Sequence, residues 1–156
     1  MTGFWPITCL FLVFLQAAGT PPPSGEIFNA KEKARFEKAD KVDGRIKVYT
    51  DASKRIQQTL EDAINKDDFQ AFPDNLKLWT SLLSKSLEDI ETNLKSKKKS
   101  KNLIRFEIQV RKAISNSLNY KIKSPVELHD AFDACLEKAE KIRQQFVEIL
   151  FDTKKQ

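Results

Sequence analysis

Residues 124–151 read SPVELHDAFDACLEKAEKIRQQFVEILF and carry the clearest folding signal in the chain. Ser124 suits an N-cap, Pro125 suits the first helical position, and Glu127 completes a capping box. Apolar or small residues then recur at spacings of three and four, the pattern of one buried helical face. They are Leu128, Phe132, Cys135, Ala139, Ile142, Phe146 and Ile149. The stretch therefore predicts an amphipathic helix that ends near Phe151.

A second capping box, Asn29 to Glu32, predicts a helix start near the other end of the chain. Helical spacing then continues to residue 66 and passes through Gly44. An unbroken helix over 29–66 would be about 57 Å long at 1.5 Å per residue. We therefore expect a long first helix that is bent at Gly44, broken at Asp43–Gly44, or protruding in its first half.

Two further helices are predicted between these segments. One follows the turn residues at 67–68 and 73–74 and carries an apolar stripe. Trp79 lies near the edge of this stripe, so we expect it either in the core or at the rim of the core. The other covers about 102–123. Its residues 104–110 alternate like a strand, but Ile114, Leu118 and Ile122 continue the apolar pattern at helical spacing.

The whole chain has 156 residues with only 4 Gly and 6 Pro, which excludes collagenous and low-complexity classes and disfavours a β-sandwich. Four amphipathic helices joined by short loops predict an all-α fold, an antiparallel up-and-down bundle of about four helices. We place this bundle domain at residues 29–152 and a frayed tail at 153–156.

Residues 1–19 have the pattern of a signal peptide. The apolar run over 4–18 is shorter than the roughly 20 residues needed to span a bilayer, and small residues follow it at 17–19. No Lys or Arg precedes the run, which departs from the usual pattern. A Pro-rich linker is expected over 20–28. These features predict a secreted or periplasmic protein with no transmembrane span after cleavage; the alternative is an uncleaved membrane anchor.

Cysteine chemistry is limited in the predicted mature chain. Cys9 leaves with the leader, and Cys135 alone cannot form an internal disulfide. Cys135 lies near the centre of an apolar helical face, so we expect a packed, unreactive thiol. A disulfide between two copies is the alternative.

Motifs for catalysis, metals or cofactors are missing from the sequence. His129 is the only histidine, and the Glu-x-x-His pairs of di-metal bundles do not occur. His129 and Asp133 could meet on one helix, but two ligands do not make a metal site, so a surface histidine is expected. The mature chain keeps two glycines, Gly25 and Gly44, and neither forms a phosphate-binding loop. We expect a non-enzymatic protein without cofactor or metal.

Charge is distributed unevenly along the chain. Residues 95–123 carry a net charge of +9, whereas the whole chain carries +5. We expect Glu107 to pair with Arg111 one turn later. Seven of the other cations form the candidate contact set for an anionic partner. This set is Lys97, Lys98, Lys99, Lys101, Arg105, Lys112 and Lys123.

The sequence thus favours a binding module whose basic face contacts a lipid head group, an acidic glycan or an acidic protein. A solvated face that only keeps the domain soluble is the alternative for the charges. A nucleic-acid partner is not expected, because no recognition motif is present. Two other functions stay open: a small-ligand carrier or enzyme with a site inside the bundle, and a self-assembling bundle or homo-oligomer.

Overall fold

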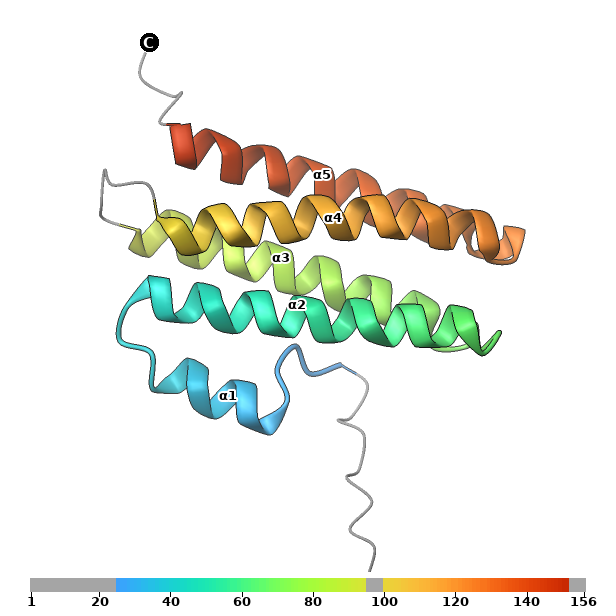
Figure 1. Cartoon of the computed structure of the whole chain (residues 1–156), viewed down its shortest axis with the longest axis horizontal. Coiled ribbons are helices and arrows are strands. Elements are labelled where there is room, and N and C mark those ends of the chain that lie inside the picture. Colours follow the sequence, from blue (N-terminus) through green and yellow to red (C-terminus); the bar gives the residue numbers. More distant parts are fainter. Residues whose placement is uncertain (1–24, 95–99, 152–156) are drawn as a thin grey trace, which may run out of the picture.

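The computed structural model describes residues 25–94 and 100–151, and these ranges are helical apart from short connections (Figure 1). The predicted all-α class is confirmed. The predicted leader 1–19, most of the linker 20–28 and the tail 153–156 lie outside the described residues. The elements are α1 (Ala30–Glu37), α2 (Val42–Asn65), α3 (Phe72–Asn93), α4 (Lys101–Lys123), a short 3₁₀ turn η1 (Val126–Leu128) and α5 (His129–Phe151).

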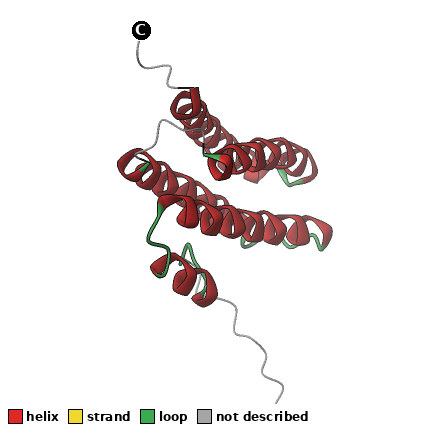
Figure 2. Cartoon of the chain, turned by 60° about the vertical axis from the view of Figure 1, so that its left-hand side comes forward, coloured by secondary structure: helices red, strands yellow, loops and turns green. Residues whose placement is uncertain are grey.

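Helices α2 to α5 form the predicted bundle, and consecutive helices run in opposite directions (Figures 1 and 2). α2 and α5 each pack against both α3 and α4. α3 and α4 follow each other in the chain but lie at opposite corners, so α2 and α4 are parallel neighbours. The hydroxyl of Ser100, before α4, accordingly donates to the carboxylate of Asp43 in the first turn of α2.

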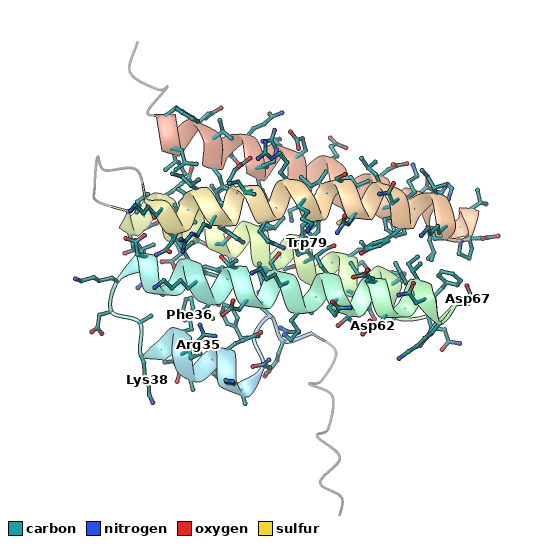
Figure 3. All side chains as sticks on the ribbon, viewed as in Figure 1. Arg35, Phe36, Lys38, Asp62, Asp67 and Trp79 are labelled. Atoms are coloured by element: carbon teal, nitrogen blue, oxygen red, sulfur yellow. The ribbon has the colours of Figure 1, made fainter. Side chains whose placement is uncertain are left out.

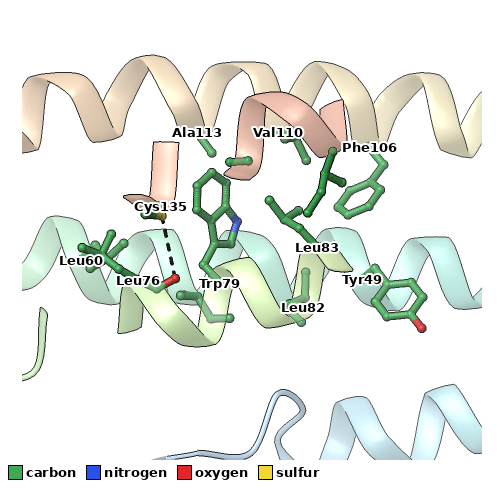
Figure 4. Packing of buried hydrophobic residues seen from close by; sticks show 14 of the residues in the cluster. Tyr49, Leu60, Leu76, Trp79, Leu82, Leu83, Phe106, Val110, Ala113 and Cys135 are labelled. Atoms are coloured by element: carbon green, nitrogen blue, oxygen red, sulfur yellow. Dashed lines mark hydrogen bonds between the residues drawn. The ribbon is translucent and has the colours of Figure 1, made fainter. Parts of the chain in front are cut away.

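The centre of the bundle is built around Trp79 of α3, which is fully buried. Figure 4 shows its ring pointing from α3 towards α4. Its indole Nε1–H donates to Ser53 Oγ on α2 at 2.8 Å, so burial leaves no polar atom of this side chain unpaired. Of the two positions predicted for Trp79, the structure selects the core.

The long first helix predicted over 29–66 is two helices. The Asn29–Glu32 capping box is present, with hydrogen bonds of 2.8 and 2.9 Å, but α1 ends at Glu37 and α2 begins at Val42. The break therefore precedes Gly44, which lies in the first turn of α2 instead of forming the bend. A Cβ at Gly44 would lie 3.2 Å from Ala39 Cβ, so glycine allows the connection to pass close to the helix.

Because of this break, α1 folds back onto α2. Phe36 lies between α1 and α2 (Figure 3), with its ring centroid 5.4 Å from that of Tyr49. Arg55 of α2 donates to Glu32 at 2.9 Å and to the carbonyl oxygen of Ile27 at 2.8 Å. The first half of the predicted helix thus has a partner within the chain.

The start of the last helix also differs from the prediction. Ser124 ends α4, and its hydroxyl donates to the carbonyl oxygen of Lys121 at 2.8 Å instead of capping α5. Pro125 has extended backbone angles and leads into η1, so α5 begins only at His129. The helical prediction for 104–110 is confirmed, because these residues lie within α4.

Candidate binding surface on helix α4

Helix α4 begins at a fixed point beside α2. Ser100 accepts a hydrogen bond from the amide of Leu103 at 3.1 Å, and its hydroxyl donates to Asp43. Ser100 is therefore an N-cap that also joins α4 to its parallel neighbour. This attachment, with Phe106 and Val110 buried in the core, determines which side chains of α4 face outwards.

Four predicted contact residues lie on the outward side of α4. Lys101, Arg105, Lys112 and Lys123 are all exposed, and at about 100° per residue they fall within about 40° of one another. We call these four residues the basic stripe. It extends about 33 Å along the helix at 1.5 Å per residue. Lys97, Lys98 and Lys99 lie outside the described residues.

The arginines of the described chain divide into two groups. Arg35, Arg45, Arg55 and Arg143 each form an ion pair with a carboxylate, at 2.7 to 2.9 Å. Arg105 and Arg111, both exposed on α4, form no ion pair with any residue in 25–94 or 100–151. Both arginines that lack an ion pair in the described chain thus lie on α4: Arg105 belongs to the basic stripe, and Arg111 lies outside it.

The predicted pair between Glu107 and Arg111 is wrong. Glu107 is buried at the contact with α5, where it accepts from Arg143 at 2.8 Å. Arg143 also donates to Glu140 at 2.7 Å, and this interaction lowers the pKa of Glu140. A guanidinium reaching from a neighbouring helix therefore outcompetes the helix neighbour, and Arg111 stays exposed beside the groove between α4 and α5.

An apolar row adjoins the basic stripe on α4. Ile108, Leu118 and Ile122 are 47%, 50% and 79% exposed, and Ile104 is half-buried. We call Ile104, Ile108, Leu118 and Ile122 the apolar row. Their helical spacing predicts that these residues belong to the buried apolar stripe, but in the structure they lie at or near the surface. The apolar arc of α4 is wider than α2 and α5 can cover, since Leu103, Phe106, Val110 and Tyr120 already fill the buried side.

One end of the apolar row borders a groove between α4 and α5 with a volume of about 380 Å³. Ile104, Ile108 and Arg111 line it from α4, and Val147 and Leu150 line it from α5. Ile122 lies beyond this groove. The apolar row is therefore longer than the groove and continues along the outside of the bundle.

Candidate metal ligands do not converge in the described part of the chain. Residues 25–94 and 100–151 hold no group of three or more His, Cys, Asp or Glu side chains that could bind a metal ion. Asp133 pairs with Lys121 at 2.6 Å, and His129 is half-buried instead of lying on the surface as predicted. The His129 Nε2 atom is buried without a hydrogen-bond partner.

Cys135 occupies the packed position that the sequence predicts. Its side chain is buried, with Sγ 3.8 Å from the carbonyl oxygen of Leu76 (Figure 4). Burial raises the pKa of the thiol to about 12. Because the thiolate is the reactive form, this environment makes Cys135 a poor nucleophile.

No family model, curated protein or solved structure matches this chain. Within the described residues, none of the helices is both long enough and apolar enough to span a bilayer.

Proposed function

We propose that this protein is a non-enzymatic binding module whose basic stripe contacts an anionic partner. The observation that carries the proposal is the set of four exposed cations on one side of α4, none with a carboxylate partner among the described residues. Unpaired cations on one line produce a local positive potential that attracts anions. Ion pairs elsewhere in the bundle already compensate four of the other arginines.

The same proposal places the protein outside the cytoplasm, as a secreted or periplasmic protein. Support comes from the apolar run and small residues of 1–19 and from the Pro-rich stretch that follows. Intact mass spectrometry of protein from its natural host tests this placement. A mature chain that starts at Thr20 supports it, and a retained leader contradicts it.

Binding to immobilised heparin tests the charge requirement of the stripe. We expect the wild-type chain to bind at low salt, and the combined change Arg105→Gln, Lys112→Gln and Lys123→Gln to lower the salt concentration at which it elutes. A second variant, with Lys97, Lys98 and Lys99 changed to Gln, measures the contribution of the preceding segment.

The matched control is Lys77→Gln with Lys138→Gln and Lys141→Gln. These lysines are also exposed but lie on α3 and α5, and the change in net charge is the same. If the control and the stripe variant elute alike, total charge governs retention and the stripe has no special role. Wild-type protein that passes through at low salt would refute the proposal directly.

A further inference from the structure

We infer that the anionic partner is the surface of a lipid bilayer that contains anionic lipids, and that the outward half of α4 lies on it. This inference rests on the proposed function, because it uses the same basic stripe. It adds the apolar row as the part of the surface that distinguishes a bilayer from a soluble polyanion.

The outward half of α4 contains no carboxylate. Glu107 is the only acidic residue of α4, and it is buried against Arg143 of α5. The side chains that remain on the outside are cationic, apolar or small and polar. They are Lys101, Ile104, Arg105, Ile108, Arg111, Lys112, Ser115, Leu118, Asn119, Ile122 and Lys123. Such a surface is complementary in charge to an anionic bilayer over its full length.

The apolar and basic residues are arranged as an interfacial helix requires. At about 100° per residue, the apolar row and the basic stripe occupy adjacent arcs of the same helix. In an interfacial helix the apolar arc enters the boundary between head groups and acyl chains. The long Lys and Arg side chains beside it reach the head groups while their stems remain in apolar surroundings.

Two carboxylates of α5, the helix that packs beside α4, already have cationic partners. Asp133 is paired with Lys121 and Glu140 with Arg143. These pairs reduce the repulsion that an anionic bilayer would otherwise meet beside α4.

The extent of the apolar row favours a bilayer over an acidic peptide. A bound peptide helix needs a groove for its own apolar face. The groove between α4 and α5 involves Ile104 and Ile108, but the most exposed apolar residue of the row, Ile122, lies beyond it. Val126 is 72% exposed and follows α4 directly in η1, so the exposed apolar residues continue past the end of the helix. A flat surface can contact this whole length.

Vesicle co-sedimentation of the mature chain tests the inference. The probes are phosphatidylcholine vesicles with and without phosphatidylglycerol. We expect binding only to the vesicles with phosphatidylglycerol. Each cation removed in Arg105→Gln, Lys112→Gln or Lys123→Gln should weaken binding by about fivefold. The control variant with Lys77, Lys138 and Lys141 changed to Gln should bind vesicles close to the wild-type level.

The decisive variant is Ile108→Ser with Ile122→Ser. It leaves every charge in place, so we expect unchanged elution from heparin but at least fivefold weaker vesicle binding. Wild-type protein that binds heparin but no vesicle would overturn the lipid inference and leave the proposed function standing. Failure to bind either probe would end both.

Two further outcomes would also overturn the inference. If the Ile108→Ser, Ile122→Ser variant binds vesicles like wild type, the apolar row does not enter the bilayer. If that variant instead changes the sedimentation coefficient from that of a dimer to that of a monomer, a second copy of the chain covers the row. Circular dichroism shows whether the helical bundle is intact in the Ile108→Ser, Ile122→Ser variant and in the variant with Arg105, Lys112 and Lys123 changed to Gln. Loss of binding counts only where the bundle is intact.

Discussion

Arg143 and Arg105 lie on neighbouring helices but in different electrostatic settings. Arg143 is flanked by Glu107 at 2.8 Å and Glu140 at 2.7 Å, and its side chain is largely shielded from solvent. Arg105 is exposed and has no carboxylate partner in the described chain. The first arginine compensates a buried carboxylate, whereas the second is available to a partner outside the molecule.

We therefore expect the same substitution to reduce stability strongly at Arg143 and hardly at all at Arg105. Arg143→Gln leaves the Glu107 carboxylate buried without its cation, which should lower the free energy of unfolding by about 2–4 kcal/mol. Arg105→Gln should change it by less than about 0.5 kcal/mol, as is usual at the surface. Urea unfolding followed by circular dichroism measures both values.

The double variant Glu107→Gln with Arg143→Gln identifies the cause of the loss. Removing the stranded carboxylate should recover part of the stability, because a neutral amide costs less to bury than a charge. If Arg143→Gln proves as harmless as Arg105→Gln, the ion pair contributes no stability and the contrast between the two arginines fails.

At the scale of the elements, four amphipathic segments could be recognised from periodicity because each helix buries one face. Their ends were harder to place. The sequence allowed a break at Asp43–Gly44, but the helix is interrupted earlier, at residues 38–41. The local sequence pattern around residues 38–41 does not indicate that Phe36 packs back onto Tyr49, which lies beyond the break. Ser124 could cap either neighbouring helix, and the choice depends on the turn that follows.

The candidate surface shows the same division between local and long-range information. Arg105, Lys112 and Lys123 share one side of α4 because helical spacing alone determines this. Lys101 joins them because the Ser100 N-cap starts the helix before the predicted 102. The partner of Glu107 depends on the packing of α5, which the sequence of α4 does not contain. The exposed apolar row depends on how far α2 and α5 extend around α4, and this too is set by the assembled bundle.

Helix α1 should be less stable than the four-helix core and should unfold locally without it. Its Phe36 ring and the Phe28 ring just before the helix pack against Tyr49 of α2, and α1 lies outside the four-helix core. Phe36→Ala removes the central ring of this contact, and because Phe36 is half-buried we expect a loss of about 1–2 kcal/mol. Hydrogen exchange should accelerate in α1 and remain slow around Trp79 in α3.

The matched control for this change is Phe132→Ala, whose ring is fully buried between helices of the bundle. That variant should accelerate exchange throughout α2 to α5 and destabilise the protein by about 3–5 kcal/mol. Equal acceleration of α1 and the bundle in Phe36→Ala would show that α1 is part of the cooperative core.

For the whole molecule, α2 and α4 lie side by side and run in the same direction. Consecutive helices are antiparallel, as an up-and-down bundle requires, but α3 and α4 occupy opposite corners of the bundle. In this arrangement α4 packs against both α2 and α5, whose contacts bury one side of α4 and leave the opposite side exposed. The candidate surface is therefore a consequence of the topology as well as of the sequence of α4.

Stability of the whole bundle should be greatest near neutral pH and decrease on both sides. On the acid side, Arg143 lowers the pKa of Glu140 below its usual 4.5. As the pH falls below about 4.5, Glu140 takes up a proton in the unfolded chain before it does so in the folded chain. The free energy of unfolding therefore decreases as the pH decreases. On the alkaline side, burial raises the pKa of Cys135 from 9.0 to about 12. The unfolded thiol therefore loses its proton first, and stability falls as the pH rises through this interval.

Thermal unfolding at a series of pH values, compared with that of Cys135→Ala, tests the alkaline half of this profile. Between about pH 9 and pH 10 the wild-type free energy of unfolding should decrease by up to about 1.4 kcal/mol per pH unit. Burial also raises the pKa of Tyr49 above its usual 10.0, so Cys135→Ala should still lose stability, but only from about pH 10. Adding Tyr49→Phe should flatten the curve further. Identical profiles for wild type and Cys135→Ala would mean that the thiol is not held neutral by the core, and that the packing around Leu76 and Cys135 is looser than the structure shows.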